Sequence, residues 1–204
     1  MYIGDGYRVK LPHPEILNTL RPNDILLLDD GKLKMKVIAT TMQEEGENGR
    51  VDCEVVIGGK LSNKKGVNTP SIILPISPLT SKDLADLDFI LTLDVDWCAL
   101  SFVQKPEDII EIKSIIEKSS TNNHLKVMAK LEKPSAIDYL DEIVDQADGV
   151  MVARGDLGVE MNPWDVPGNI YIHLHMFMLI CTHKYIHMNT CICICIHIYI
   201  YIYI

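Results

Sequence analysis

Two short stretches of the sequence place charged side chains directly after apolar runs. In "LKVMAKLE" the run ends at Lys130 and Glu132, and in "GVMVARGD" it ends at Gly155 and Asp156. Two carboxylates suit a hard divalent cation such as Mg²⁺, which binds oxygen ligands and keeps positions for substrate oxygens and water. A lysine two residues from such a ligand places a point charge against a transferring phosphoryl group or a developing enolate. These residue types therefore predict metal-assisted chemistry.

Both stretches are predicted to be β-strands, in which alternate side chains share a face. The two faces consist of Lys126, Met128, Lys130 and Glu132 in the first strand and of Val150, Val152, Arg154 and Asp156 in the second. The charged groups end their strands at the edge where parallel α/β proteins bind ligands. Glu132 and Asp156 are 24 positions apart, one strand-helix-strand repeat, so we expect them to project into one site. The alternative is a solvated strand end with a surface ion pair between Lys130 and Glu132.

The flanking elements indicate two kinds of structure. Residues 1 to about 68 read as a small antiparallel β-domain, with a tight turn at Asp30 and Gly31 in "ILLLDDGKLKMKVIA". Beyond them, "TSKDLADLDFILTL", "KPEDIIEIKSIIEK" and "SAIDYLDEIVDQA" have helical spacing, and Thr80 or Ser81 is a candidate N-cap of the first. The strands "DWCALSF", "LKVMAKLE" and "GVMVARG" alternate with these helices. An α/β fold follows, either a doubly wound sheet or part of a (β/α)₈ barrel.

Composition excludes several classes of protein. The chain has 204 residues, is 48% hydrophobic and 23% charged, and carries a net charge of -9, which fits a globular protein. Such a charge argues against nucleic acid and acidic membrane surfaces as partners, because both need a basic footprint. No export signal is recognisable at the start of the chain. The body contains only Cys53 and Cys98, which is typical of a reduced compartment without a disulfide framework.

The last part of the chain has a different composition. From Asn169 to Ile204 the only formally charged side chain is Lys184, and the segment ends "CICICIHIYIYIYI". It is compatible with a β-strand, with a membrane span, or with a metal site on one strand face made of Cys191, Cys193, Cys195 and His197. We favour translated non-coding sequence, since alternating purine-pyrimidine repeats encode such alternations. Its high β-propensity and low charge also predict aggregation.

Several long motifs, in the right order, resemble pyruvate kinases. "LKVMAKLEKPSAI" is similar to that family's active-site signature, and "DGVMVARGDLGVE" to its metal-binding turn. "GGKLSNKKGVNTP" resembles the return from the lid domain, and "DWCALSFVQKPEDI" the fourth barrel strand with its helix. The resemblance covers roughly residues 4 to 167.

The resemblance implies a (β/α)₈ TIM barrel with an inserted small β-barrel lid domain. Residues 1–68 would be part of the lid, 69–167 barrel strands four to six, and 168–204 a low-complexity tail that is not native. The remaining barrel strands and the effector-binding domain are expected to be missing. We therefore expect the chain as written to be inactive and poorly folded by itself, because three strands cannot close a barrel.

The resemblance also implies an activity and its site. The family transfers phosphate from phosphoenolpyruvate to ADP, giving pyruvate and ATP, with Mg²⁺ (or Mn²⁺) and K⁺; the K⁺ site is expected to lie mostly outside this sequence. Lys130 would stabilise the transferring group and the enolate, and Arg154 would make a structural or interface ion pair rather than contact the substrate. The other implied roles are metal binding by Glu132 and Asp156, substrate binding by Gly155 and Ser101, and nucleotide binding by Lys65.

Partners and alternatives follow from the same resemblance. A homotetramer is the family's assembly, and we expect a cytoplasmic protein, with a plastid location as the alternative. One rival function is that of another pyruvate- or phosphoenolpyruvate-handling barrel enzyme, such as an aldolase or lyase. The other is a non-catalytic fragment or pseudogene product that binds full-length subunits.

Overall fold

The computed structural model describes most of the chain before the tail. The described residues are 7–41, 49–121, 124–162 and 165. Met1–Pro163 form one unit of the chain, and all the elements below belong to it. The predicted tail, 168–204, lies outside the described residues, as do Cys191, Cys193, Cys195 and His197.

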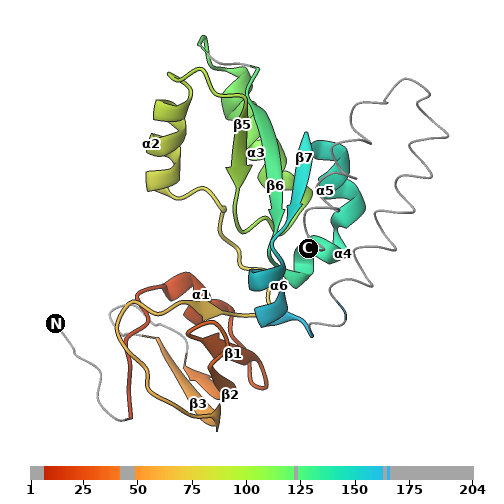
Figure 1. Ribbon diagram of the computed structural model, residues 1–204. Helices are drawn as coiled ribbons and strands as arrows, with labels where there is room; N and C mark the ends of the chain where they lie inside the picture. The colour runs from red at the N-terminus through yellow and green to blue at the C-terminus, as the bar shows by residue number, and fades with distance from the viewer. Residues whose placement is uncertain (1–6, 42–48, 122–123, 163–164, 166–204) are drawn as a thin grey trace. The chain divides into compact units, whose positions relative to one another are not determined.

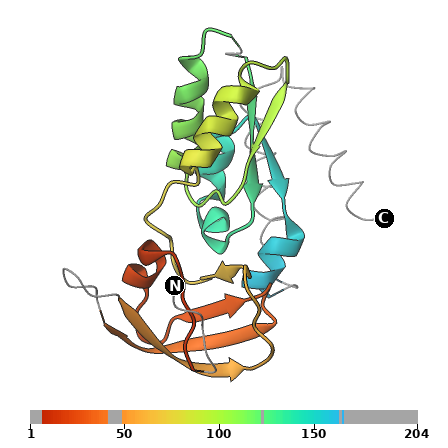
Figure 2. The ribbon, with the colours of Figure 1, turned by 90° about the vertical axis from the view of Figure 1, so that its left-hand side faces the viewer.

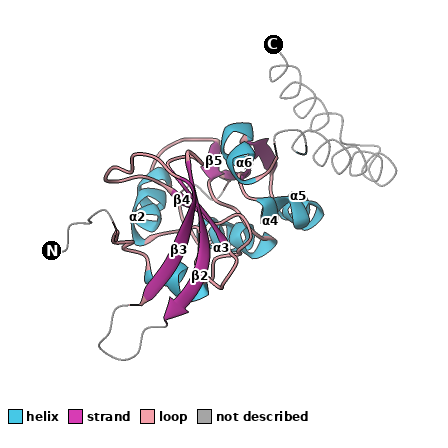
Figure 3. Ribbon diagram, turned by 90° about the horizontal axis from the view of Figure 1, so that it is seen from below, coloured by secondary structure: helices cyan, strands magenta, loops and turns pink. Residues whose placement is uncertain are grey.

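The N-terminal part forms an antiparallel sheet. Its strands are β1 (Ile25–Leu28), β2 (Leu33–Thr41), β3 (Arg50–Ile57) and β4 (Val67–Asn68), in the order β3-β2-β1-β4. Figure 3 shows β2 and β3 as the long pair of this sheet. The predicted hairpin is confirmed, since Leu28 pairs with Leu33 across the turn. That turn runs through left-handed backbone at Asp29, Asp30 and Gly31, where glycine and short polar residues are favoured.

A short helix precedes this sheet and was not expected from the prolines around it. Helix α1 (Pro14–Thr19) begins with Pro14 at a position that needs no backbone N–H, and it has Glu15 in its first turn. Its residue Ile16 packs with Leu20, Leu26 and Val37 in a small apolar cluster. The antiparallel sheet thus has a core of its own.

The second sheet is parallel and consists of β5 (Trp97–Leu100), β6 (Lys126–Leu131) and β7 (Gly149–Val152) in that order. In Figure 1 these strands lie side by side and run in the same direction. Helix α3 (Pro106–Glu117) connects β5 with β6, while α4 (Pro134–Asp138) and α5 (Leu140–Gln146) connect β6 with β7. The predicted alternation of helices and parallel strands is confirmed for this part of the chain.

The helices cover one face of the parallel sheet, as Figure 2 shows. Burial in β6 alternates, with Val127, Ala129 and Leu131 inside and the residues between them more exposed. The buried side chains pack against an apolar stripe of α3, formed by Ile109, Ile112 and Ile116, as its spacing predicts. Lys130 therefore lies on the face that these helices leave open.

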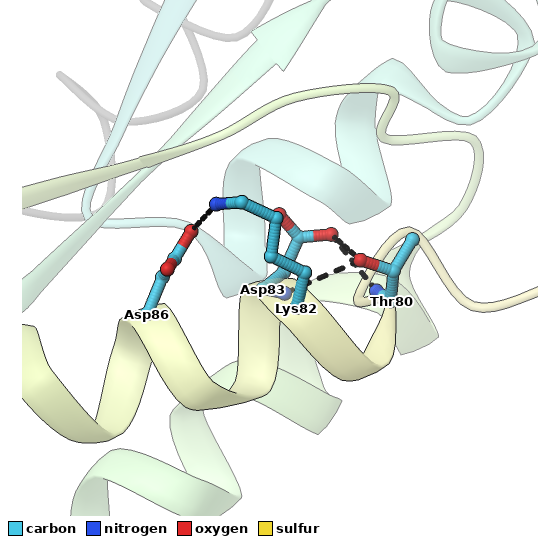
Figure 4. Close-up of polar contacts among 4 residues, drawn as sticks. All are labelled: Thr80, Lys82, Asp83 and Asp86. Carbon is cyan, nitrogen blue, oxygen red and sulfur yellow. Dashed lines mark hydrogen bonds and ion pairs between the residues drawn. The ribbon is translucent and has the colours of Figure 1, made fainter.

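Helix α2 (Ser81–Ile90) begins where the sequence indicates. Thr80 is its N-cap: the Thr80 Oγ1 accepts from the Asp83 backbone N at 3.2 Å, and the Thr80 N donates to Asp83 Oδ2 at 2.9 Å. Figure 4 shows this reciprocal capping box together with the ion pair of Lys82 and Asp86 one turn along. Both contacts stabilise the first turns of α2, and its residue Leu87 packs in the core.

One expected helix is divided. The segment predicted to be a single helix breaks at Tyr139, whose ψ of 24° separates α4 from α5. Both pieces still bury apolar residues, namely Ile137, Leu140 and Ile143.

Two further properties bear on the sequence analysis. Cys53 and Cys98 are free, and burial raises the pKa of both thiols, which makes them poor nucleophiles. Among the described residues, no helix has the length and apolar character needed to cross a bilayer.

Candidate active site

Lys130 and Glu132 form a cluster with Ser101 at the carboxyl ends of β5 and β6. The Lys130 Nζ donates to Ser101 Oγ at 2.9 Å and pairs with Glu132 Oε1. The other carboxylate oxygen, Oε2, accepts from the backbone N of Phe102 at 2.8 Å. The Glu132 side chain is 3% exposed and that of Lys130 25% exposed. The pair is therefore largely buried, and the alternative of a solvated surface ion pair is wrong.

The strands themselves explain this cluster. Leu100 pairs with Ala129, so Ser101 and Lys130 are the next residues along two neighbouring parallel strands. Lys130 and Glu132 are two positions apart and share a face, as the strand period predicts. Phe102 has a φ of +56°, a conformation that is rare for an aromatic residue. Its backbone N–H bond to Glu132 holds the chain in that conformation.

Asp156 lies in a helix and not at the end of a strand as expected. The strand β7 ends at Val152, and Arg154 and Asp156 belong to helix α6 (Arg154–Glu160). Val150 and Val152 pack against the helix-covered core, because they pair with Ala129 and Leu131 rather than with Lys130. The expectation that Val150, Val152, Arg154 and Asp156 share one strand face is therefore wrong.

The physical reason is that the chain leaves the strand at Ala153, whose ψ of 75° is outside the strand range. The Ala153 N still donates to the Leu131 O at 3.2 Å, so α6 begins beside the end of β6. Asp156 is exposed in the first turn of that helix, and Arg154 is exposed too. The structure thus brings Lys130, Glu132 and Ser101 into contact and gives Asp156 a place on the adjoining helix.

Gly155 stands in open space. A Cβ built on it would meet no heavy atom of the described residues within 4 Å, and the same is true of Gly158 in the same helix. The packing of the chain therefore does not require a glycine at Gly155.

Lys65 lies in the segment between β3 and β4 and is held by a carboxylate. Its Nζ is 2.8 Å from Asp29 Oδ1, and Asp29 Oδ2 is 3.3 Å from Lys32 Nζ. The hydrogen bond from Lys65 lowers the pKa of the Asp29 carboxyl below its usual value, and Asp29 in turn raises the pKa of Lys65. Lys65 is therefore a charged ammonium whose side chain points toward Asp29.

A second buried ion pair joins Lys133 and Glu160. Lys133 Nζ is 2.5 Å from Glu160 Oε1, and their side chains are 9% and 1% exposed. The same oxygen accepts from Asn68 Nδ2 at 2.8 Å. Lys133 directly follows Glu132, but its partner is 27 positions away, and no short motif signals such a pair.

The comparisons with known proteins decide the family. A protein-family model described as "Pyruvate kinase, barrel domain" matches residues 3–181. The chain belongs to the pyruvate kinase family. The resemblance drawn from the motifs is thereby confirmed.

Individual pyruvate kinases agree with this assignment. The chain is 50% identical over 166 residues to a pyruvate kinase of Agrobacterium vitis, a match that covers 81% of this chain and 32% of that protein. It is 49% identical over 165 residues to a pyruvate kinase of Methylorubrum extorquens, with the same two shares. It is 48% identical over 144 residues to pyruvate kinase 2 of Synechocystis sp., covering 70% of this chain and 23% of that one. The chain spans about a third of the length of the first two relatives.

Proposed function

We propose that this chain carries part of the site at which a pyruvate kinase transfers the phosphoryl group of phosphoenolpyruvate to ADP, giving pyruvate and ATP. The main support is the cluster of Lys130, Glu132 and Ser101 at the carboxyl ends of two parallel strands, in a chain of this family. In this proposal β5, β6 and β7 are strands four to six of a (β/α)₈ barrel within 69–167, and β1 to β4 belong to a lid domain within 1–68.

The residues fit a divalent metal such as Mg²⁺ or Mn²⁺. Glu132 is fixed by two donors, Asp156 is exposed at the start of α6, and both offer the hard oxygen ligands that these ions prefer. When bound, the ion supplies Lewis-acid stabilisation of charge on the phosphoryl and enolate oxygens. K⁺ is the second cofactor of the proposed reaction, and we assign no described residue to it. Among the residues described, no three His, Cys, Asp or Glu side chains gather in one group.

The remaining residues have roles that follow from charge. Negative charge spreads over the transferring and leaving oxygens in the transition state, and the Lys130 ammonium stabilises it there more than in the ground state. Ser101 and Glu132 hold that ammonium in place. Gly155 donates its backbone N–H to the substrate carboxylate. Lys65 leaves its partner Asp29 and binds the phosphates of the nucleotide.

Gly155 gives the sharpest test of these roles. Among the described residues, no atom lies within 4 Å of the methyl group that alanine would add at Gly155 or Gly158, so neither substitution should reduce stability. Only Gly155→Ala should place a methyl group against bound substrate. We expect it to weaken phosphoenolpyruvate binding to the purified chain by about tenfold or more, while Gly158→Ala leaves binding unchanged. Calorimetric titration in the presence of Mg²⁺ measures both. Equal affinities in the two variants would contradict the proposed site.

The activity of the 204-residue chain by itself is a separate matter. We predict that the purified chain forms no ATP from phosphoenolpyruvate and ADP, because the barrel strands in hand do not close a site alone. A coupled assay that follows pyruvate tests this, and substrate-dependent ATP formation would overturn it. Co-purification with intact pyruvate kinase subunits would instead support the alternative of a subunit-binding fragment.

A further inference from the structure

The buried carboxylate of Glu160 joins three segments that each carry a residue of the proposed site. Its Oε1 accepts from Lys133 at 2.5 Å and from Asn68 at 2.8 Å. Lys133 directly follows Glu132. Glu160 is four residues after Asp156 in α6, one helical turn further along. Asn68 is three residues after Lys65. One side chain therefore links the neighbours of both proposed metal ligands and of the proposed nucleotide lysine.

The turn that holds the partner of Lys65 also lies near α6. The β1–β2 turn contains Asp29, the partner of Lys65. In that turn, a Cβ built on Gly31 would lie 3.5 Å from Cγ1 of Val159, the residue before Glu160. The segment of Lys65 is thus bonded to α6 through Asn68, and the turn that holds its partner Asp29 lies close to the same helix.

Stability alone is a poor explanation for this junction. The second oxygen of Glu160, Oε2, is buried and has no hydrogen-bond partner among the described residues. A buried carboxylate oxygen without a donor costs free energy, and replacing a buried ion pair by apolar groups is often neutral or stabilising. Such a pair can instead select one arrangement of the segments that it joins.

We propose that Glu160 is a positioning residue that couples the nucleotide lysine Lys65 to the metal ligands Glu132 and Asp156, through its bonds to Asn68 and Lys133. The inference rests on the proposed function. Coupling of this kind is reciprocal: bound metal raises the affinity for nucleotide by the same factor as nucleotide raises the affinity for metal.

The test measures that factor in the 204-residue chain. Free Mn²⁺ is followed by electron paramagnetic resonance with and without saturating ADP. A titration of ADP without protein corrects for the Mn²⁺ that the nucleotide itself binds, and the ratio of the two corrected Kd values gives the coupling. Coupling between linked sites is typically about 5- to 150-fold. Asn68→Ala removes the link to Lys65 and keeps the ion pair of Lys133 and Glu160. We expect the coupling factor to fall to about one. The affinity of the variant for Mn²⁺ alone and for ADP alone should change less than about threefold.

Two further variants keep the result interpretable. Asn63→Ala is the matched control, because Asn63 is exposed in the same segment, and it should keep the coupling. The double variant Lys133→Met with Glu160→Leu replaces both buried charges with apolar groups of similar size, so it should fold. Glu160→Gln alone would instead leave the buried Lys133 ammonium without a carboxylate partner. It should still bind Mn²⁺ and lose the coupling, because Asn68 no longer has an acceptor.

The outcomes separate the inference from the function on which it rests. Unchanged coupling in Asn68→Ala, or an equal loss of both single-ligand affinities with coupling retained, would overturn the role of Glu160 and leave the proposed function standing. Failure of the unsubstituted chain to bind either Mn²⁺ or ADP would overturn the binding roles proposed for Glu132, Asp156 and Lys65 in this chain, and the inference with them.

Discussion

At the scale of the residue, Glu132 combines a structural and a proposed chemical role. One of its oxygens holds the backbone of Phe102 in a left-handed conformation and the other pairs with Lys130. The side chain is almost wholly buried. A carboxylate with such contacts is fixed in direction before any ligand arrives, which is what a metal ligand needs.

This double role predicts a stability loss on truncation. Glu132→Ala leaves the partly buried N–H of Phe102 without an acceptor and Lys130 without its carboxylate partner. We expect the free energy of unfolding to fall by roughly 2–3 kcal/mol. Urea denaturation of the chain measures it. The control is Glu54→Ala on the exposed side of β3, which should cost about 0.5 kcal/mol or less. Equal losses in the two variants would mean that the bonds of Glu132 contribute nothing.

Asp29 predicts a pH dependence. Its pKa is lowered from the ordinary 3.8, first by the hydrogen bond from Lys65 and then by Lys32. A lowered pKa contributes stability that is present above the ordinary value and lost as pH falls through the value in the folded chain. The advantage of the unsubstituted chain over Asp29→Asn should therefore shrink as the pH is lowered from about 5 to about 2.

Unfolding free energies at several pH values check this expectation, and Asp30→Asn is the matched control because Asp30 is exposed in the same turn. An advantage over Asp29→Asn that grows toward low pH would show that the ion pair with Lys65 is not formed in solution.

Residue-level prediction from the sequence reached only some of these contacts. Lys130 and Glu132 were found because they are two positions apart at the end of an apolar run. The partners of Glu160 are 27 and 92 positions away. Pairs of that kind depend on how β4, α4 and α6 are arranged in space, and neither periodicity nor a short motif contains that information.

At the scale of the element, hydrophobic spacing predicts where strands and helices lie, whereas the backbone conformation at their ends determines where they stop. Helix α3 and strand β6 follow their apolar periods closely. The same reasoning extended β7 through Asp156, although the chain turns into α6 after Ala153. A strand end and a first helical turn can both place charge after an apolar run, so the sequence pattern did not separate them.

The start of α2 allows an element-scale prediction. Thr80→Ala removes the side chain that accepts from the Asp83 backbone N (Figure 4), and the free energy of unfolding should fall by about 1 kcal/mol. Lys82→Ala removes only the exposed pair with Asp86 in the same helix and should cost about 0.5 kcal/mol or less. Urea denaturation of both variants ranks them. A larger loss for Lys82→Ala would contradict the role given to the capping box.

At the scale of the whole molecule, the described chain contains two sheets of different kinds. The family match over residues 3–181 includes both sheets. The proposed lid, inserted before the fourth barrel strand, would account for an antiparallel sheet that precedes a parallel one. The sequence motifs predict this order of the two sheets. They did not predict α1, the division between α4 and α5, or the buried junction at Glu160.

The central claim is that Glu132 and Asp156 bind the same metal ion. Electron paramagnetic resonance measures the affinity of the chain for Mn²⁺. That affinity should fall by about tenfold or more in Glu132→Gln and in Asp156→Asn. The double variant should bind hardly more weakly than either single one, because ligands of one ion do not contribute additively. Additive losses, or a binding constant that neither substitution changes, would contradict the proposed site.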